Sequence, residues 1–123
     1  MLNFVSTEGA CALTLGPFQQ IRLEGEVMRG DAGGPVIAKH ENHTWRVDGS
    51  RYQRIECDSP VRLHMERVDG SRSKDWGPFD CISFVDGIAY ANHEVFAFAD
   101  RSIVDWYCHA DDTHWPLLIA EAV

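Results

Sequence analysis

Apolar and polar residues alternate along most of this chain, in short segments separated by turn-forming residues. Ile21 and Leu23 alternate with Arg22 and Glu24, and the segment 61–66 follows the same pattern. Because a period of two places successive side chains on opposite faces of a strand, each segment predicts a half-buried β-strand. The predicted strands span residues 10–15, 20–28, 35–40, 43–48, 51–57, 61–68, 80–85, 88–92, 94–99 and 103–108.

Helix signals are confined to the C-terminal part of the chain. Residues 102–105 match the capping-box pattern, in which Ser102 caps a first turn that contains Asp105. In the segment 113–123, Thr113 suits a helix cap and Pro116 suits a first turn. The sequence therefore predicts a mainly β, antiparallel meander that forms a small barrel or sandwich. It allows one or two short helices near the C-terminus, and the alternative class is α+β.

A chain of 123 residues fits one domain, which we expect to span residues 1–123. Its net charge is −8, and the segment 75–123 contains a single basic residue, Arg101, against nine acidic residues. Because nucleic-acid binding requires clustered cations, we expect no nucleic-acid partner. An acidic segment of this kind also leaves open a weaker alternative, an inhibitor that binds a basic protein.

The chain lacks an apolar run of about 20 residues, so we expect no contact with a membrane. The first residues do not place an apolar stretch after a basic one, as a secretory signal would. Cysteines occur at positions 11, 57, 81 and 108, and no two of them form a C-x-x-C pair. We therefore expect buried thiols and a cytoplasmic location.

Two kinds of internal repeat are visible. Residues 43–51 match residues 64–72 at seven of nine positions, and both segments end in Asp-Gly-Ser-Arg. Since Asp-Gly favours hairpin turns, the repeat predicts a meander with a further turn at 58–60 and both Asp-Gly turns at one end. Arg51 and Arg72 would then lie side by side, where they could bind a carboxylate or a phosphate. Separately, Gly-Pro-Phe occurs at 16–18 and again at 77–79.

The segment 106–115 has the highest density of chemically versatile side chains. Histidines and carboxylates alternate there between aromatic rings, and the candidate ligand-binding residues are Trp106, Tyr107, His109, Asp111, Asp112, His114 and Trp115. Imidazole and carboxylate groups suit zinc, manganese or iron, so His109, Asp111 and His114 are candidate metal ligands. A histidine next to a carboxylate also suits a general base.

Familiar catalytic motifs are missing from the sequence. There is no G-x-S-x-G elbow, Walker loop or G-x-G-x-x-G. Residues 30–35 resemble the Gly-Asp-Ser-Gly-Gly-Pro signature of chymotrypsin-like serine proteases, but Ala32 occupies the nucleophile position. A glycine-rich loop between two strands accounts for this segment without catalysis.

The sequence therefore predicts a binding module that holds a small organic ligand in an aromatic pocket of the C-terminal half. The alternative is a metal-dependent or acid–base enzyme that uses the cluster at residues 109–114. We expect no organic cofactor, and a divalent metal remains an option. A homodimer is expected, because so many short strands leave sheet edges to be covered.

Overall fold

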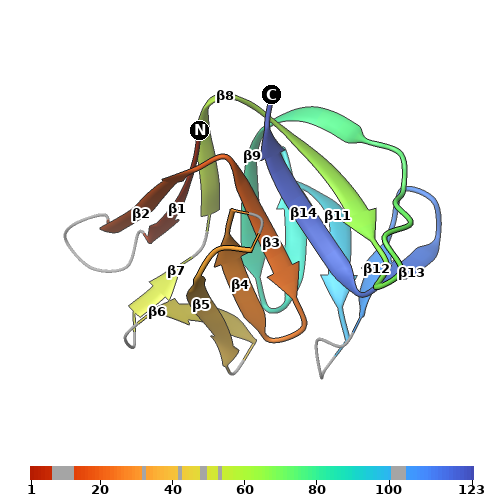
Figure 1. Ribbon diagram of the computed structural model, residues 1–123, viewed down its shortest axis with the longest axis horizontal. Helices are drawn as coiled ribbons and strands as arrows, with labels where there is room; N and C mark the ends of the chain where they lie inside the picture. The colour runs from red at the N-terminus through yellow and green to blue at the C-terminus, as the bar shows by residue number, and fades with distance from the viewer. Residues whose placement is uncertain (7–12, 32, 42, 48–49, 53, 101–104) are drawn as a thin grey trace.

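Alternating segments pair into an antiparallel β-structure in this computed structural model (Figure 1). The structure describes residues 1–6, 13–31, 33–41, 43–47, 50–52, 54–100 and 105–123, with the backbone alone described at 13, 50–52 and 54–59. The strands are β1 (Leu2–Ser6), β2 (Leu13–Phe18), β3 (Gln20–Glu24), β4 (Val27–Gly30), β5 (Val36–Glu41), β6 (Thr44–Val47), β7 (Ser50–Tyr52), β8 (Arg54–Glu66), β9 (Trp76–Val85), β10 (Ile88–Ala91), β11 (Glu94–Ala99), β12 (Trp106–Cys108), β13 (Thr113–Trp115) and β14 (Leu117–Ala122). The predicted mainly β class is confirmed.

The helix predicted for residues 113–123 is wrong, because this segment forms β13 and β14. β14 is a central strand that pairs with β3 on one side and β8 on the other. Leu118 and Ala120 pack in the core, and Ile119 is fully buried on the opposite face. Pairing on both edges satisfies the backbone of β14, so tertiary contacts outweigh the local helix signals. The other helix signal, at 102–105, lies mostly outside the described residues.

Several predicted strand boundaries are also wrong, and the strand Leu2–Ser6 was not predicted. The segment 20–28 is a hairpin of β3 and β4, and Gly25 in its turn has a positive φ of 56°. The predicted turn at 58–60 is instead part of the long strand β8. The register of β8 against β9 shifts between Glu56 and Val61, so Pro60 lies where the ladder is interrupted. A proline is tolerated there because no ladder hydrogen bond requires its missing N–H.

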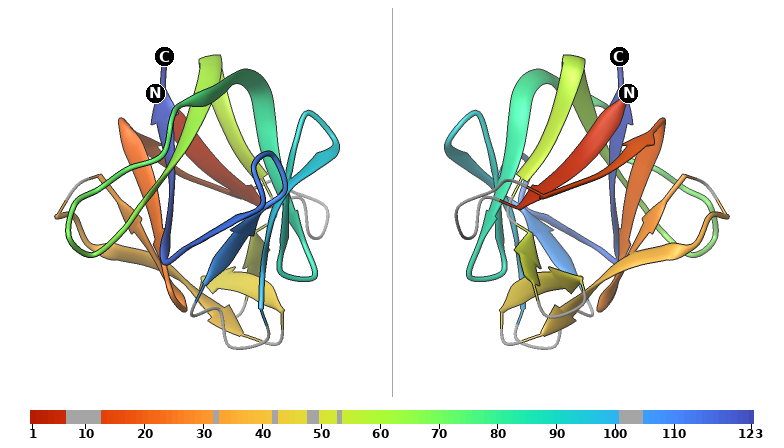
Figure 2. Two further views of the ribbon diagram at one scale, coloured as in Figure 1. Left: turned by 90° about the vertical axis from the view of Figure 1, so that its right-hand side faces the viewer. Right: turned by 90° about the vertical axis from the view of Figure 1, so that its left-hand side faces the viewer.

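The sheet curls around an interior that both halves of the chain fill (Figure 2). Its strand order is β13-β12-β11-β10-β9-β8-β14-β3-β4-β5-β6-β7, and β1 joins β8 to β2. In that order the terminal strands β13 and β7 do not pair, so the described sheet is not a closed barrel. The described residues also contain no helix with the length and hydrophobicity needed to span a membrane.

The second half of the chain repeats the backbone arrangement of the first. Gly16 and Gly77 begin the two Gly-Pro-Phe segments and have positive φ values of 138° and 122°. A Cβ on Gly16 would lie 2.9 Å from the carbonyl oxygen of Leu2, and one on Gly77 would lie 3.0 Å from that of Val61. The same close approach of glycine to a neighbouring strand is therefore built twice, which explains why glycine is required at both positions.

Strand pairing follows the same repeat. Ile21 pairs with Gly30 in the β3–β4 hairpin, and Ile82 pairs with Ala91 in the β9–β10 hairpin, 61 residues later in each case. The antiparallel pairing of β1 with β2 corresponds to the antiparallel pairing of the C-terminal part of β8 with β9. Many positions of β1–β4 thus have a structural counterpart in β8–β10. Where the two residues differ, the repeated backbone accommodates both side chains.

His40 on β5 gives the fold a pH-dependent element. Its ring packs edge-on against Trp45 at a centroid distance of 5.2 Å, and its buried Nε2 has no hydrogen-bond partner. Burial, followed by the charge of His43, lowers the pKa of His40 below the ordinary value of 6.5, although Glu26 opposes the shift. The unfolded chain therefore binds the proton first, and stability is lost as the pH falls below 6.5.

Replacing His40 with glutamine is expected to reduce this loss of stability at acidic pH. Urea unfolding midpoints measured at about pH 7.5 and about pH 5.5 should differ less for His40→Gln than for the wild type. The exposed His93 provides the matched control, His93→Gln, which should keep the wild-type difference. Equal pH dependence in all three proteins would contradict the assignment to His40.

Candidate functional site

Several of the predicted site residues gather around Tyr107 on the outer face of β11, β12 and β13. The Tyr107 ring lies 5.1 Å from that of His109, 5.0 Å from that of His114 and 4.9 Å from that of Phe98, centroid to centroid. Phe98, Tyr107 and His114 are direct cross-strand partners, so the sheet register brings them together. His109 and His114 are exposed at the edge of this group.

Carboxylates orient the polar atoms of this cluster. The Tyr107 hydroxyl donates to Asp112, and the Thr113 hydroxyl donates to Asp111. His114 Nδ1 lies 3.0 Å from a carboxylate oxygen of Asp105. Asp111 is thus engaged within its own turn, and no group of three His, Cys, Asp or Glu side chains in the described part of the chain is placed to share a metal ion. The divalent metal stays a prediction.

The two tryptophans of the predicted segment do not join this surface. Trp106 is fully buried in the core, and Trp115 is 7% exposed and belongs to the same core. Strand alternation explains the separation, because Trp106 and Tyr107 are adjacent and therefore point to opposite faces. The Trp115 indole N–H donates to Thr113 Oγ1 at 2.6 Å. These two side chains therefore build the core beneath the cluster.

A pocket lined by aromatic residues lies next to His109 in the C-terminal half of the chain. It has a volume of about 300 Å³, and its lining includes Trp76, Phe79, Phe96 and His109. Phe96 is the centre of its floor, because its ring lies 5.2 Å from that of Trp76 and 5.9 Å from that of Phe79. The exposed Glu94 and His109 supply polar groups at the rim.

The predicted pairing of Arg51 and Arg72 is wrong. Arg51 lies in β7, the last strand of the sheet order, whereas Arg72 lies in the segment after β8 and bridges back to Glu66. Figure 1 shows β7 and the β8–β9 connection on opposite sides of the molecule. β8 runs straight through the position of the predicted turn, so Arg51 and Arg72 do not meet at one end of a meander. Arg72 Nη2 instead pairs with Asp75 Oδ1 at 2.6 Å.

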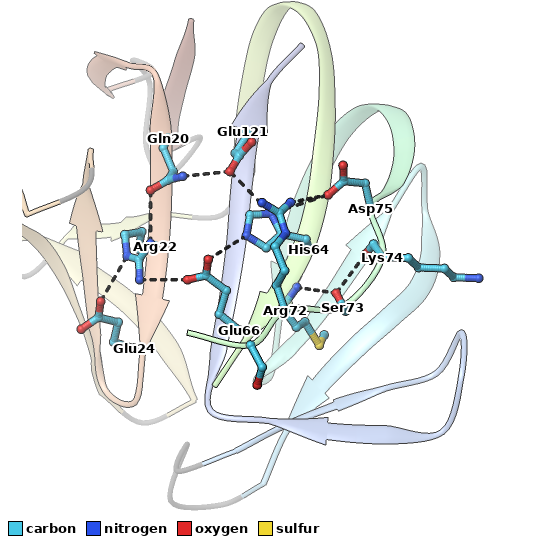
Figure 3. Close-up of polar contacts among 12 residues, drawn as sticks. Gln20, Arg22, Glu24, His64, Glu66, Arg72, Ser73, Lys74, Asp75 and Glu121 are labelled. Carbon is cyan, nitrogen blue, oxygen red and sulfur yellow. Dashed lines mark hydrogen bonds and ion pairs between the residues drawn. The ribbon is translucent and has the colours of Figure 1, made fainter. Parts of the chain in front are cut away.

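A second polar site lies on the outer face of β3, β14 and β8, centred on His64 (Figure 3). His64 is only 2% exposed. Its Nε2 lies 3.4 Å from Glu66, and its Nδ1 lies 3.5 Å from Glu121 and 3.9 Å from Asp75. Three separate segments therefore supply a carboxylate to one buried imidazole, and the ring ties β8, β14 and the β8–β9 loop together.

Arg22 extends this network toward the β3–β4 hairpin. Its guanidinium reaches Glu24 Oε1 and Glu66 Oε2, each at 3.3 Å, and Gln20 Oε1 at 3.4 Å. Gln20 in turn donates to Glu121 at 2.9 Å, which closes the ring of contacts seen in Figure 3. Glu66 is therefore held from both sides, by His64 on one carboxylate oxygen and by Arg22 on the other.

The repeated backbone accepts other side chains at several positions of this network. Strand register places Val5 where the other half has His64, and Cys81 and Ser83 where it has Gln20 and Arg22. Val5 is buried at 6% exposure, so an apolar side chain fits the backbone at the position that corresponds to His64. The backbone alone thus does not dictate histidine, glutamine and arginine at these three positions, which favours a role beyond folding.

Sequence analysis missed the His64 network. The alternation pattern places Arg22, Glu24, His64 and Glu66 on the polar faces of two half-buried strands but does not bring the two faces together. The missing information was the order of strands, because β14 inserts between β3 and β8 and brings Glu121 beside both polar faces.

Comparison with models of protein families, with curated proteins and with solved structures finds no match for this chain.

Proposed function

We propose that this protein is a binding module that holds a small, flat organic ligand in the aromatic pocket beside His109. The observation that supports the proposal is the combination of volume and lining. A pocket of about 300 Å³ is at the lower end of the range for small-molecule sites, and its floor consists of Trp76, Phe79 and Phe96. Such a floor favours an aromatic or alicyclic body over a flexible polar chain.

The rim supplies the orienting groups for such a ligand. The His109 ring provides a donor or an acceptor, and Glu94 provides a carboxylate for a hydroxyl, an amide or a cation. His109 is itself held against Tyr107 and Phe98 by ring contacts of 5.1 and 5.0 Å. The Tyr107 cluster therefore positions one wall of the pocket and need not contact the ligand.

Closing the pocket is expected to abolish binding of flat aromatic compounds. Ala110 is exposed at the mouth of the pocket, so Ala110→Trp should plug it without disturbing the core. Indole and indole-3-acetate serve as probes, and saturation-transfer NMR measures their dissociation constants. We expect saturable binding to the wild type and a loss of at least about tenfold, or about 1.4 kcal/mol, in Ala110→Trp.

Val85→Trp is the matched control, since Val85 is 53% exposed and lies outside the pocket lining. It adds the same ring at another surface position and should keep wild-type binding. Equal binding of the probes by all three proteins would disprove the pocket assignment. Native mass spectrometry of freshly purified protein also measures the mass of any retained ligand or metal and the number of subunits.

The acid–base alternative is supported by a different observation, the ion pair between His114 and Asp105. His114 Nδ1 lies 3.0 Å from the Asp105 carboxylate, and the histidine side chain is 63% exposed. A carboxylate in this position orients a histidine for proton transfer through its other nitrogen. The ring neighbours Tyr107. If the protein is found to catalyse a reaction, the pH dependence of its rate is compared between the wild type, His114→Asn and His93→Asn. A profile that changes in His114→Asn but not in His93→Asn would favour an enzyme over a binding module.

The proposal includes a homodimer in the cytoplasm. In the described strand order, β7 and β13 each pair with one neighbour, and a second copy could cover such an edge. Cys81 and Cys108 are free thiols, which suits a reducing compartment. Burial raises the pKa of the Cys108 thiol, so this cysteine is expected to be chemically inert.

A further inference from the structure

A groove separate from the aromatic pocket runs beside the His64 network. It has a volume of about 440 Å³, and its lining includes Arg22, Glu24, Glu66, Arg67 and Leu117. The turn after β8 forms one wall and the β3–β4 turn forms the opposite one. The groove therefore combines two cations and two carboxylates with an apolar surface.

The wall after β8 is ordered by its own hydrogen bonds. Arg67 N–H donates to the Ser71 carbonyl at 2.8 Å, and Gly70 N–H donates to the Arg67 carbonyl at 2.9 Å. Asp69 accepts from both the backbone N–H and the hydroxyl of Ser71, at 2.9 and 2.6 Å. Val68, also in this turn, is 92% exposed and lines the groove. The wall is thus preorganised and presents an apolar side chain to whatever enters the groove.

Arg67 is the cation best placed to receive an anion. Its guanidinium carbon lies 4.0 Å from the centroid of the Trp115 ring, so the aromatic face holds the group in place. Among the described residues, no carboxylate forms an ion pair with it, whereas Arg22 is engaged by Glu24, Glu66 and Gln20. A planar guanidinium fixed by stacking keeps its N–H groups for bidentate binding of a carboxylate.

Glu24 and Glu66 supply the opposite charge on the groove lining. Arg22 Nε and Nη2 hold one oxygen of each, His64 holds the second oxygen of Glu66, and Arg29 Nε lies 3.8 Å from the second oxygen of Glu24. The register counterpart of Glu24 in the other half is Val85, so the repeated fold tolerates an uncharged residue there. A carboxylate oxygen accepts more than one hydrogen bond, so these fixed carboxylates favour an ammonium group in the groove over an anion.

We propose that this groove binds a small zwitterion of the α-amino-acid class with an apolar side chain. The ligand carboxylate pairs with Arg67, its ammonium group faces the carboxylates of Glu24 and Glu66 from the groove, and its side chain packs against Val68 and Leu117. The ligand thereby offers an anion to Arg67 and a cation to the two carboxylates, whereas a simple anion or a simple amine offers only one of these charges. The inference concerns a site apart from the aromatic pocket and does not depend on it.

The test compares three probes that differ only in their charged groups. L-leucine has both charges, 4-methylpentanoate lacks the ammonium group and isoamylamine lacks the carboxylate. Binding is measured on the whole chain by NMR chemical-shift titration of backbone amides. We expect leucine to bind at least about tenfold more tightly than either relative, with shifts at the amides of residues 66–70 and of Leu117. No saturable binding of leucine, or equal binding of leucine and 4-methylpentanoate, would overturn the proposal.

Variants assign the binding to the groove. Arg67→Gln and Glu24→Gln are expected to weaken leucine binding by about tenfold or more, since each removes one charged partner. Lys74→Gln is the matched control, because Lys74 is a cation of the same connection that does not line the groove. Ala110→Trp should also leave leucine binding unchanged, so failure of the aromatic-pocket proposal is distinguishable from failure of this one. Unchanged binding in Arg67→Gln and Glu24→Gln would refute the groove site.

Discussion

Replacing Trp106 with alanine is expected to lower the free energy of unfolding by about 3–5 kcal/mol, the largest effect of any single truncation proposed for this chain. Trp106 is fully buried in β12, and no side chain nearby can collapse into a space of indole size without loss of contacts. Its counterpart Trp45 in β6 is 2% exposed, and Trp45→Ala should cost a similar amount. Urea unfolding followed by circular dichroism measures both values.

Trp106→Phe is the informative partner of this experiment. The Nε1 atoms of Trp45, Trp76 and Trp106 are buried and have no hydrogen-bond partner. Phenylalanine removes the unsatisfied donor while retaining an aromatic ring, so the cost should be about 1 kcal/mol or less. If Trp106→Phe destabilised the protein as much as Trp106→Ala, the indole nitrogen would have an interaction that this structure does not account for.

Replacing His64 with valine is expected to destabilise the protein by about 1–3 kcal/mol, the second large effect. Valine is the residue that the other half of the chain uses at the corresponding position, Val5, so its shape is compatible with the backbone. The cost arises because Glu66, Glu121 and Asp75 lose the imidazole that they share. Chemical unfolding measures the change.

Arg62→Val provides the control on the same strand. Arg62 is exposed, and its replacement should change the free energy of unfolding by no more than about 0.5 kcal/mol. A neutral or stabilising His64→Val would mean that the network costs more in desolvation than its contacts return. That outcome would strengthen the case for function, because a network that does not stabilise the fold needs another reason to exist.

Local sequence patterns were sufficient to predict most strands. Glu94–Ala99 has the bounds that alternation predicted, and Ile88–Ala91 differs from its prediction by one residue. The expectation that Asp-Gly favours hairpin turns is also met at Asp86 and Gly87. These two residues separate β9 from β10 and have positive φ values of 49° and 78°. These features depend on residues close together in the chain, so the sequence alone predicts them.

The internal repeat shows the limit of such reasoning. The nine-residue match between 43–51 and 64–72 is the stronger sequence signal, yet the two segments occupy different places in the fold. The shorter Gly-Pro-Phe match marks the true structural repeat, because Gly16 and Gly77 make the same approach to a neighbouring strand. Sequence identity over a few residues does not reveal which strands pair, since pairing depends on burial far along the chain.

The candidate sites also differ in how far the sequence alone could predict them. Aromatic density in the C-terminal half predicted a ligand pocket there; the structure has a pocket with His109 in its lining, and ligand binding to it stays a prediction. The amino-acid sequence by itself determined the β class and the alternating faces, because both follow from local periodicity. Only the tertiary structure decided that β14 lies between β3 and β8, and hence that His64, Glu66, Glu121 and Arg22 share one surface. Strand order is a long-range choice made by the packing of the common core, and no local pattern encodes it.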